Sequence, residues 1–293
     1  MTDAITEERR TGTPVAKLCA LAQFPRSRYY RELKRVQTMP DPEEMRLRDL
    51  IQDICVDASC YGYRRVTAEL RRKGHRINHK RVLALMRKDN LLCLRKKKHW
   101  IATTDSRHGL RVYPNLASSM TVTDINQLWV ADITYIRLRY EFVFLAAILD
   151  VFSRKAIGWA LSRQLDASLT VAALLMAIRG REIISGLVHH SDRGVQYASS
   201  EYTDVLKKHG IAISMSRKEN PYDNAFAESF MKTLKSEEVY LNEYDNFSST
   251  HENLGRFIEI VYNTKRLHSS LGYRPPEEFE SLIQTQKASH QFA

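Results

Sequence analysis

The chain has 293 residues, 43% of them hydrophobic and 27% charged, which indicates one sizeable globular domain with one or two small ones. No stretch approaches the roughly 18 uninterrupted apolar residues of a membrane helix, and the N-terminus lacks the apolar core of a signal peptide, so we expect a cytoplasmic protein without membrane contact. The net charge is +11, and residues 61–100 alone hold 14 Lys or Arg residues against two acids, which predicts a surface that binds nucleic-acid phosphates.

Two other interpretations of this part of the chain are weaker. A solvated basic face would normally have acidic residues interspersed among its Lys and Arg residues. A zinc site is the other alternative, because Cys55, Cys60, His75 and His79 loosely resemble a ligand set. The gap between the two pairs is longer than usual and His75 stands in a predicted turn, so we do not expect zinc and treat the cysteines as reduced thiols.

The predicted elements begin with short helices within residues 1–40. A helix capped by Asp41 then extends to about residue 57, and two more helices follow, joined by a short turn after Gly74. The second of this pair turns basic side chains outward, a pattern typical of a helix-turn-helix, and we predict a DNA-binding domain over residues 41–100. The residues expected to contact DNA there are Arg64, Arg65, Lys80, Arg81, Arg87 and Lys88.

Residues 101–121 are predicted to form a linker, after which β-rich runs appear. The expected order over residues 122–240 is β-β-β-α-β-α-β-α, which is typical of an α/β fold of the RNase H type with a mixed five-stranded sheet and helices. Residues 241–293 look helical and are predicted to form a C-terminal extension. The predicted strands cover 128–136, 142–151, 156–162, 187–190 and 211–215, and the helices 166–180, 199–209 and 224–240.

Three acidic residues stand at unusual places in this pattern. Asp132 lies inside an apolar strand, where a carboxylate must be paired or bound to metal. Asp192 follows the end of another apolar strand, and Glu228 lies on the first turns of a helix. Because hard oxygen ligands suit Mg²⁺ or Mn²⁺, we predict that these three residues are both the catalytic residues and the ligands of two Mg²⁺ ions, for which Mn²⁺ can substitute. Asp132 is the expected bridging ligand.

The residues around the acids carry a resemblance. Asp192 and Glu228 have 35 residues between them, Lys235 follows Glu228 by seven, and the segments 129–135, 190–197 and 220–230 surround the three acids. With residues 262–276, these motifs resemble a family of bacterial insertion-sequence transposases encoded in two overlapping frames. The chain is similar to the product of the second, catalytic frame, over about residues 15–280.

The resemblance implies a DDE transposase with an RNase H-like integrase core. Such an enzyme nicks the ends of its element and joins the freed 3′-hydroxyl to target DNA. The implied partners are insertion-sequence ends, target DNA, further copies of the chain, and the first-frame protein or a fusion with it, in the bacterial cytoplasm at the nucleoid. Lys235 matches a basic position of the family, and helical spacing places Lys232 and Lys235 near Glu228, where both are expected to contact DNA.

Two other functions stay open on the sequence alone. An RNase H-like nuclease would cleave DNA without joining it, although the 35-residue gap and Lys235 disfavour that function. A DNA-binding regulator with an inactive core is disfavoured by the intact acidic triad. Four neighbouring residues, His190, Asp150, Asn224 and Arg193, have structural explanations as good as functional ones, and we assign no role to them.

Overall fold

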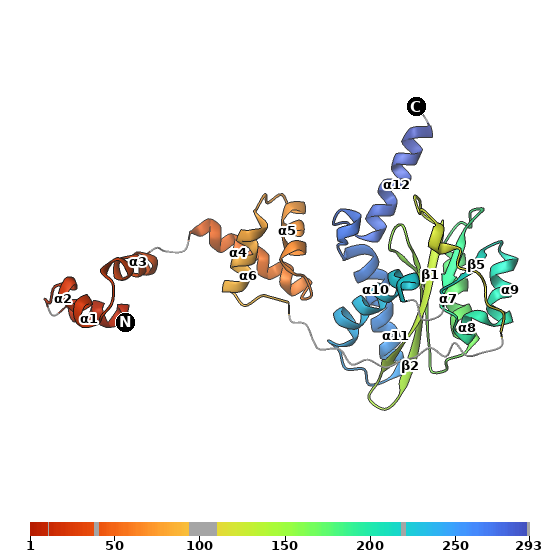
Figure 1. The fold of residues 1–293 in the computed structure, drawn as a ribbon, viewed down its shortest axis with the longest axis horizontal. Helices are drawn as coiled ribbons and strands as arrows, with labels where there is room; N and C mark the ends of the chain where they lie inside the picture. The colour runs from red at the N-terminus through yellow and green to blue at the C-terminus, as the bar shows by residue number, and fades with distance from the viewer. Residues whose placement is uncertain (11, 38–40, 94–109, 218–220, 292–293) are drawn as a thin grey trace. The chain divides into compact units, whose positions relative to one another are not determined.

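The computed structural model describes residues 1–10, 12–37, 41–93, 110–217 and 221–291. The chain divides into two compact units, Met1–Cys93 and Leu94–Ala293, which are described separately (Figure 1). The basic run at residues 95–98 and the first part of the predicted linker, residues 101–109, lie outside the described residues. None of the described helices is long and apolar enough to cross a membrane.

The first unit contains two groups of three helices. The first group packs around buried Ile5, Cys19 and Tyr29, and the second around residues that include Ile51, Leu70 and Met86. The first group consists of α1 (Thr2–Arg9), α2 (Val15–Leu21) and α3 (Arg26–Gln37). The second consists of α4 (Pro42–Asp57), α5 (Tyr63–Arg72) and α6 (His79–Lys88).

The predicted cap at Asp41 is present in the second group, and Asn78 caps its last helix. The Asp41 side chain accepts a hydrogen bond from the Glu43 N–H at 3.1 Å, and the Asn78 side chain accepts one from the Lys80 N–H at 2.8 Å. Gly74, with a φ of +89°, follows α5 in the left-handed conformation that glycine adopts at helix ends. The pair of helices expected from the sequence, α5 and α6, is therefore confirmed together with the turn that joins it.

The second unit is built on a mixed five-stranded sheet, as the sequence predicts. Its strands are β1 (Leu128–Arg137), β2 (Phe142–Asp150), β3 (Ala156–Ser162), β4 (Val188–Ser191) and β5 (Ala212–Met215). Their order in the sheet is β3-β2-β1-β4-β5, in which β1 and β2 pair antiparallel, as do β2 and β3, while β4 pairs parallel with both β1 and β5.

Helices accompany this sheet in the predicted order. They are η1 (Ala117–Ser119), α7 (Ala167–Arg179), α8 (Val195–Ala198), α9 (Ser200–Lys208), η2 (Pro221–Asn224), α10 (Ala225–Leu234), the π-helix η3 (Lys235–Val239), α11 (Phe247–Arg256), the π-helix η4 (Phe257–Lys265), η5 (Ser269–Leu271) and α12 (Pro276–Gln291). The helix expected over residues 224–240 is thus divided, because its last turn widens from α to π at Lys235.

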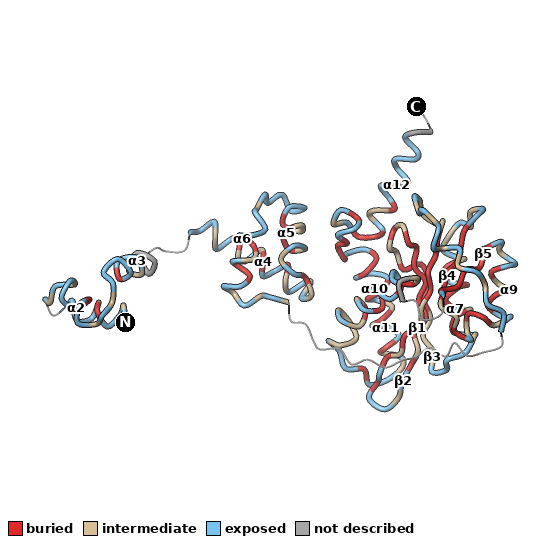
Figure 2. The backbone as a smooth tube through the Cα atoms, in the orientation of Figure 1, coloured by how far each residue is buried: buried red, intermediate tan, exposed pale blue. Residues whose placement is uncertain are grey.

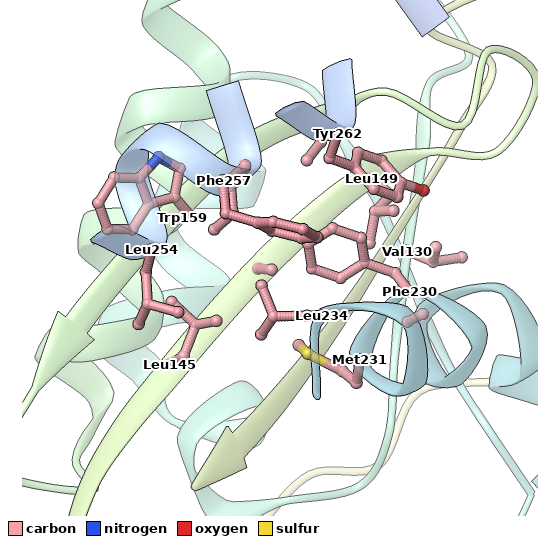
Figure 3. Close-up of a cluster of buried hydrophobic side chains, with 14 of the residues drawn as sticks. Val130, Leu145, Leu149, Trp159, Phe230, Met231, Leu234, Leu254, Phe257 and Tyr262 are labelled. Carbon is pink, nitrogen blue, oxygen red and sulfur yellow. The ribbon is translucent and has the colours of Figure 1, made fainter. Parts of the chain in front are cut away.

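The sheet is buried on both sides, and Figure 2 shows buried residues along its strands. One face packs against α7 and α9, with Trp129 among the buried side chains. The other face packs against α10, α11 and η4. Phe230, Met231 and Leu234 of α10 meet Val130 and Leu149 there, together with Phe257 and Tyr262 (Figure 3). Phe230 and Tyr262 stack edge to face at 4.8 Å between ring centroids, which fixes α10 against η4.

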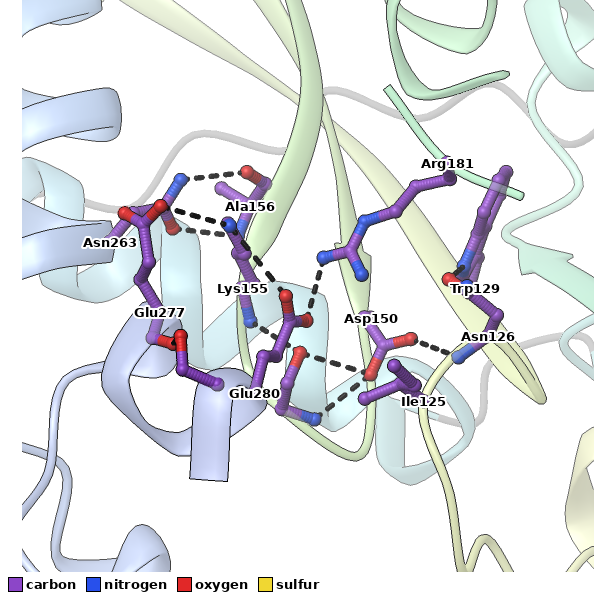
Figure 4. Close-up of polar contacts among 12 residues, drawn as sticks. Ile125, Asn126, Trp129, Asp150, Lys155, Ala156, Arg181, Asn263, Glu277 and Glu280 are labelled. Atoms are coloured by element: carbon purple, nitrogen blue, oxygen red, sulfur yellow. Dashed lines mark hydrogen bonds and ion pairs between the residues drawn. The ribbon is translucent and has the colours of Figure 1, made fainter. Parts of the chain in front are cut away.

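The C-terminal residues are joined to the sheet by buried polar contacts, shown in Figure 4. Glu280 of α12 accepts a hydrogen bond from Arg181 at 2.6 Å and lies 3.6 Å from Lys155, and its side chain is only 7% exposed. Asn263 of η4 binds both backbone groups of Ala156, accepting from its N–H at 3.0 Å and donating to its carbonyl at 2.9 Å. Residues 241–291 therefore share one compact unit with the sheet.

Candidate active site

The parallel pairing of β1 and β4 brings Asp132 and Asp192 to the same level of the sheet. Their register runs from Leu128 opposite Val188 to Val130 opposite His190. Asp132 follows Val130 by two residues, and Asp192 follows His190 by two residues. Neighbouring strands lie about 4.8 Å apart. Two carboxyl groups sixty positions apart in the sequence are thus neighbours.

Local backbone contacts orient both side chains. The Asp132 carboxylate accepts a hydrogen bond from the Ile133 N–H at 2.9 Å, and the Asp192 carboxylate accepts one from the Gly194 N–H at 2.8 Å. A Cβ atom at Gly194 would lie only 3.0 Å from Asp192 Oδ1, so a larger residue there would push on the Asp192 carboxylate. Asp192 is held in place by a turn that closes tightly around its carboxylate.

Glu228 comes to this region on α10. It lies in the first turn of the helix with an exposed side chain. Ala227, Phe230, Met231 and Leu234 occupy the opposite side of the helix and are buried against the sheet. This amphipathic pattern, with apolar residues spaced three and four apart, sets the rotation of α10 and turns Glu228 away from the core.

The three acids are electrostatically coupled. Burial, followed by the negative charges of Asp192 and Glu228, raises the pKa of the Asp132 carboxyl from 3.8 to about 8. Burial also raises the pKa of Glu228. The Lys235 ammonium acts against this rise at Asp132. One basic group does not offset two acidic neighbours, so the arrangement has an electrostatic deficit that a bound cation would relieve.

The chemistry of this donor set fits a hard divalent cation. All three side chains offer carboxylate oxygens, which Mg²⁺ and Mn²⁺ prefer. In the parts of the chain that the structure describes, however, no three His, Cys, Asp or Glu side chains form a ready-made metal-binding group. Asp132, Asp192 and Glu228 are therefore not gathered into such a group, although the charges of Asp192 and Glu228 both act on the pKa of Asp132. The same result gives the Cys55, Cys60, His75 and His79 set no support as a zinc site among the described residues.

Lys235 lies deeper than its expected DNA-contacting role suggested. The side chain is half-buried, and its Nζ lies 4.4 Å from the centroid of the Tyr135 ring on β1. The pKa of Lys235 is lowered, because the effect of burial exceeds the opposing effect of the Asp132 carboxylate. Lys235, the first residue of the π-helix η3, is therefore close enough to Asp132 for the two charges to interact. Lys232, one turn earlier, is exposed.

Asn224 is a neighbour of the site that the sequence left unassigned. It is buried and directly precedes α10, yet its side chain does not cap that helix. Its Nδ2 donates a hydrogen bond at 3.0 Å to the carbonyl of Ala131, the residue before Asp132. Its Oδ1 is buried and has no hydrogen-bond partner among the described residues. Asn224 joins the strand that carries Asp132 to the start of the helix that carries Glu228.

A second buried group whose electrostatics depend on the acids is the Tyr197 phenol. Its hydroxyl has no hydrogen-bond partner among the residues that the structure describes, and burial together with the charges of Tyr202, Asp132 and Asp192 raises the pKa of Tyr197 well above its ordinary value. The sequence carries a weak signal for this residue, since Tyr197 stands five positions after Asp192 in a short polar segment. Tyrosines at such positions are more often part of the core, which is where most of its ring lies.

The remaining polar residues near the acids have structural partners. His190 is fully buried between the hydroxyls of Ser214 and Ser216, at 2.8 and 3.0 Å. Asp150 accepts hydrogen bonds from the N–H groups of Asn126 and Ser153. Arg193 donates to the carbonyl of Ser216 at 2.7 Å. These contacts account for all three residues within the fold.

The predicted DNA contacts of the first unit lie on α5 and α6. On α6, residues 80, 81, 84, 87 and 88 repeat at intervals that place them on one face, opposite the buried Val82, Leu85 and Met86. Lys88 also pairs with Glu44 at 3.0 Å. On α5, Arg64 is exposed beside the Tyr63 ring, and Arg65 is half-buried beside Tyr61. The exposed basic residues of α6 are Lys80, Arg81, Arg87 and Lys88.

Comparisons with known families agree with this architecture. A model described as an integrase core domain matches residues 123–221, and a second one with the same description matches residues 209–276. A model of an HTH-like domain matches residues 42–99. Both the sheet with its acids and the basic helices thus fall within recognised domains, and the integrase core family is metal-dependent.

Proteins of several insertion sequences match most of the chain. The 31 kDa protein of insertion element IS600 from Shigella sonnei is 40% identical over 220 residues, which are 75% of this chain and 80% of the relative. The transposase of IS904 from Lactococcus lactis is 39% identical, over 75% of this chain and 87% of its own length. Transposase InsF of IS3A from Escherichia coli is 37% identical, over 75% and 77%. The chain therefore belongs to the family of insertion-sequence transposases built on an integrase core, which are enzymes of the polynucleotidyl transferase type.

Proposed function

We propose that the chain nicks the ends of an insertion sequence and joins the freed 3′-hydroxyl to target DNA, with Asp132, Asp192 and Glu228 as catalytic residues. The observation that carries this proposal is the placement of Asp132 and Asp192 at one level of the sheet, electrostatically coupled to Glu228. The membership of the chain in a transposase family supports the joining step over simple hydrolysis.

Each acid has a role that follows from its position. Asp132 stands on the central strand β1 and would hold two Mg²⁺ ions together with Asp192 and Glu228, and Mn²⁺ could substitute for them. When bound, the cations activate a water molecule or a 3′-hydroxyl and stabilise the leaving oxygen of an in-line displacement. Lys235 and the exposed Lys232 contact the DNA backbone beside the acids.

The test is strand transfer from a pre-cut element end into target DNA, measured with and without divalent metal. Glu228→Gln is expected to abolish joining, because the amide cannot supply a carboxylate ligand. Glu201→Gln is the matched control, since Glu201 is also an exposed acid in the first turn of a helix, α9. Joining by the Glu228 variant at the wild-type level would refute the site assignment.

The products of the same assay separate transposition from the simpler nuclease function. A nuclease yields shortened DNA strands only, whereas a transposase also yields joined strands of new length. Joined products that need metal and disappear in Asp132→Asn support the proposal. Cleavage without joining on a substrate that already carries a free 3′-hydroxyl end would favour the nuclease.

We further propose that the exposed basic face of α6 binds the DNA, with Arg64 and Arg65 of α5 beside it, and that the chain acts as a homo-oligomer. Basic residues on one helix face provide the phosphate contacts that duplex binding requires. Joining two element ends in one event needs two active sites, which is the reason for expecting more than one copy. Measuring the mass of the protein with and without a pair of element ends tests this assembly.

A further inference from the structure

The three helices before residue 38 form a small bundle whose function is unassigned. The helices α1, α2 and α3 contact one another in every pairing. They surround Ile5, Cys19 and Tyr29, which are at most 3% exposed, and Leu18, Phe24 and Leu33 pack against these three. Neither the integrase core nor the HTH-like domain model reaches this bundle.

The second and third helices of the bundle are joined by a short, well-defined turn. Only the four residues from Ala22 to Pro25 separate α2 from α3, and Gln23 adopts a φ of +49° between them. The Phe24 N–H donates to the Cys19 carbonyl at 2.8 Å, which closes the end of α2. A helix-turn-helix has a turn of three or four residues, so α2 and α3 meet this description more closely than α5 and α6, which six residues separate.

The third helix presents a polar and basic outer face. Ser27, Tyr30 and Arg31 are exposed and stand at positions i, i+3 and i+4, which lie on one side of a helix. They lie away from Tyr29, which is fully buried in the bundle. The α3 sequence carries five Lys or Arg residues against one Glu. Arg28 is also exposed, but it pairs with Glu32 of the same helix at 3.0 Å and lies over the Phe24 ring.

We propose that residues 1–37 are a second helix-turn-helix, in which α3 enters the major groove of duplex DNA and Ser27, Tyr30 and Arg31 contact it. In such domains the second helix of the pair makes the base contacts with its N-terminal residues, and these three side chains lie in that half of α3. Serine and arginine supply hydrogen bonds suited to base edges and phosphates.

The charge of the face selects DNA over a protein partner. A docking face for a second copy of the chain needs an apolar centre, and Tyr30 is the one large side chain with apolar surface among the three. The excess of basic residues on α3 complements the phosphate backbone instead.

The first test measures binding of the full chain to a fluorescent duplex of about three helical turns, in EDTA and over a series of salt concentrations. Arg31→Ala is expected to weaken binding by about five- to hundredfold and to reduce the salt slope by about one. Arg9→Ala, which removes an exposed arginine at the end of α1, is the matched control and is expected to have little effect. Wild-type affinity and salt slope in both Arg31→Ala and Arg31→Glu would refute the proposal.

The second test places a photo-crosslinking amino acid, p-benzoyl-phenylalanine, at Tyr30 and, as a control, at Arg9. Light is expected to attach the labelled duplex to the protein at position 30 and much less at position 9. A crosslink from position 30 to a second protein chain in place of DNA would show that this face is an interface between copies.

Both tests are independent of the proposed catalysis, because EDTA removes the metal and no joining is measured. If the tests show no DNA contact at α3 but the wild-type protein still performs strand transfer, the active-site assignment is unaffected. If substitution of the three acids does not impair strand transfer but α3 binds DNA, this proposal is unaffected.

Discussion

At the scale of single residues, the folded protein without metal disfavours the ionised form of Asp132. Its pKa of about 8 means that the folded protein keeps the proton at a pH where the unfolded chain has released it. Between about pH 4 and pH 8 the folded state therefore binds more protons, and stability falls as the pH rises through that range. The same burial and charge repulsion that cost stability make the site receptive to a divalent cation.

This predicts an unusual effect of Asp132→Asn. In EDTA the variant is expected to be more stable than wild type near pH 8, and the difference is expected to vanish below about pH 4, where both forms are neutral at this position. Urea denaturation at several pH values measures it. Asp204→Asn, on the exposed surface of α9, is a suitable control. A variant that is less stable than wild type at pH 8 would contradict the prediction.

Asn224 carries the second prediction at this scale. Removing the bond from its Nδ2 to the Ala131 carbonyl is expected to loosen the spacing between Asp132 and Glu228 and to weaken metal binding by about 10- to 100-fold, as for other residues that orient ligands. Asn224→Ala and the equally sized Asn224→Asp both remove the donor. Calorimetric titration with Mn²⁺ measures the effect.

The control for this variant is Asn246→Ala. Asn246 is the N-terminal cap of α11, and its side chain accepts a hydrogen bond from the Ser249 N–H at 3.0 Å. Its loss is expected to cost about 1 kcal/mol of stability and to leave Mn²⁺ affinity unchanged. If both Asn224 variants bound Mn²⁺ as wild type does, the bond to Ala131 would have no part in arranging the acids.

Single residues stand out in the sequence where burial conflicts with chemistry. A carboxylate in an apolar strand needs an explanation, and Asp132 was predicted to be a site residue for that reason. The Asn224 contact carries no such signal, because an asparagine before a helix normally caps it. Its side chain turns to the strand instead, since the tertiary packing of α10 brings the Ala131 carbonyl within reach.

At the scale of elements, the exposed face of α6 is expected to bind DNA through its charge. The double variant Lys80→Ala with Arg81→Ala is predicted to reduce the salt slope of DNA binding by about two. It is also predicted to lower the affinity for all DNA sequences by a similar factor. Fluorescence anisotropy over a salt series measures both quantities. Arg46→Ala, an exposed arginine on α4, is the control, and an unchanged slope in the double variant would place the DNA elsewhere.

Hydrophobic periodicity predicted the strands, their order along the chain and most of the helices. The apolar run of β2 and the helix cap at Asp41 are local signals, which do not depend on the tertiary contacts. The widening of the helix to a π-turn at Lys235 was not predicted, because one extra residue in a turn barely changes the pattern. Such turns are frequent at functional sites, and here the turn begins at the lysine beside Asp132.

At the scale of the whole molecule, buried ion pairs join the last helix to the sheet. Glu280→Gln is expected to destabilise the second unit by about 3 kcal/mol, because Arg181 would keep a buried charge without its partner. Glu278→Gln is the control. Glu278 pairs with Arg274 on the surface, where a pair contributes about 1 kcal/mol or less. Urea denaturation monitored by tryptophan fluorescence compares the two, and equal effects would contradict this account.

One contact of the C-terminal half also has a consequence for the solubility of the protein. Strand β3 is the last strand on its side of the sheet, and there Asn263 supplies the donor and acceptor that an adjoining strand would supply to Ala156. An outer strand with free backbone groups is a template for pairing with other chains. The core cut off after residue 240 would expose this template, so an isolated catalytic fragment is expected to aggregate, and soluble fragments should extend past η4.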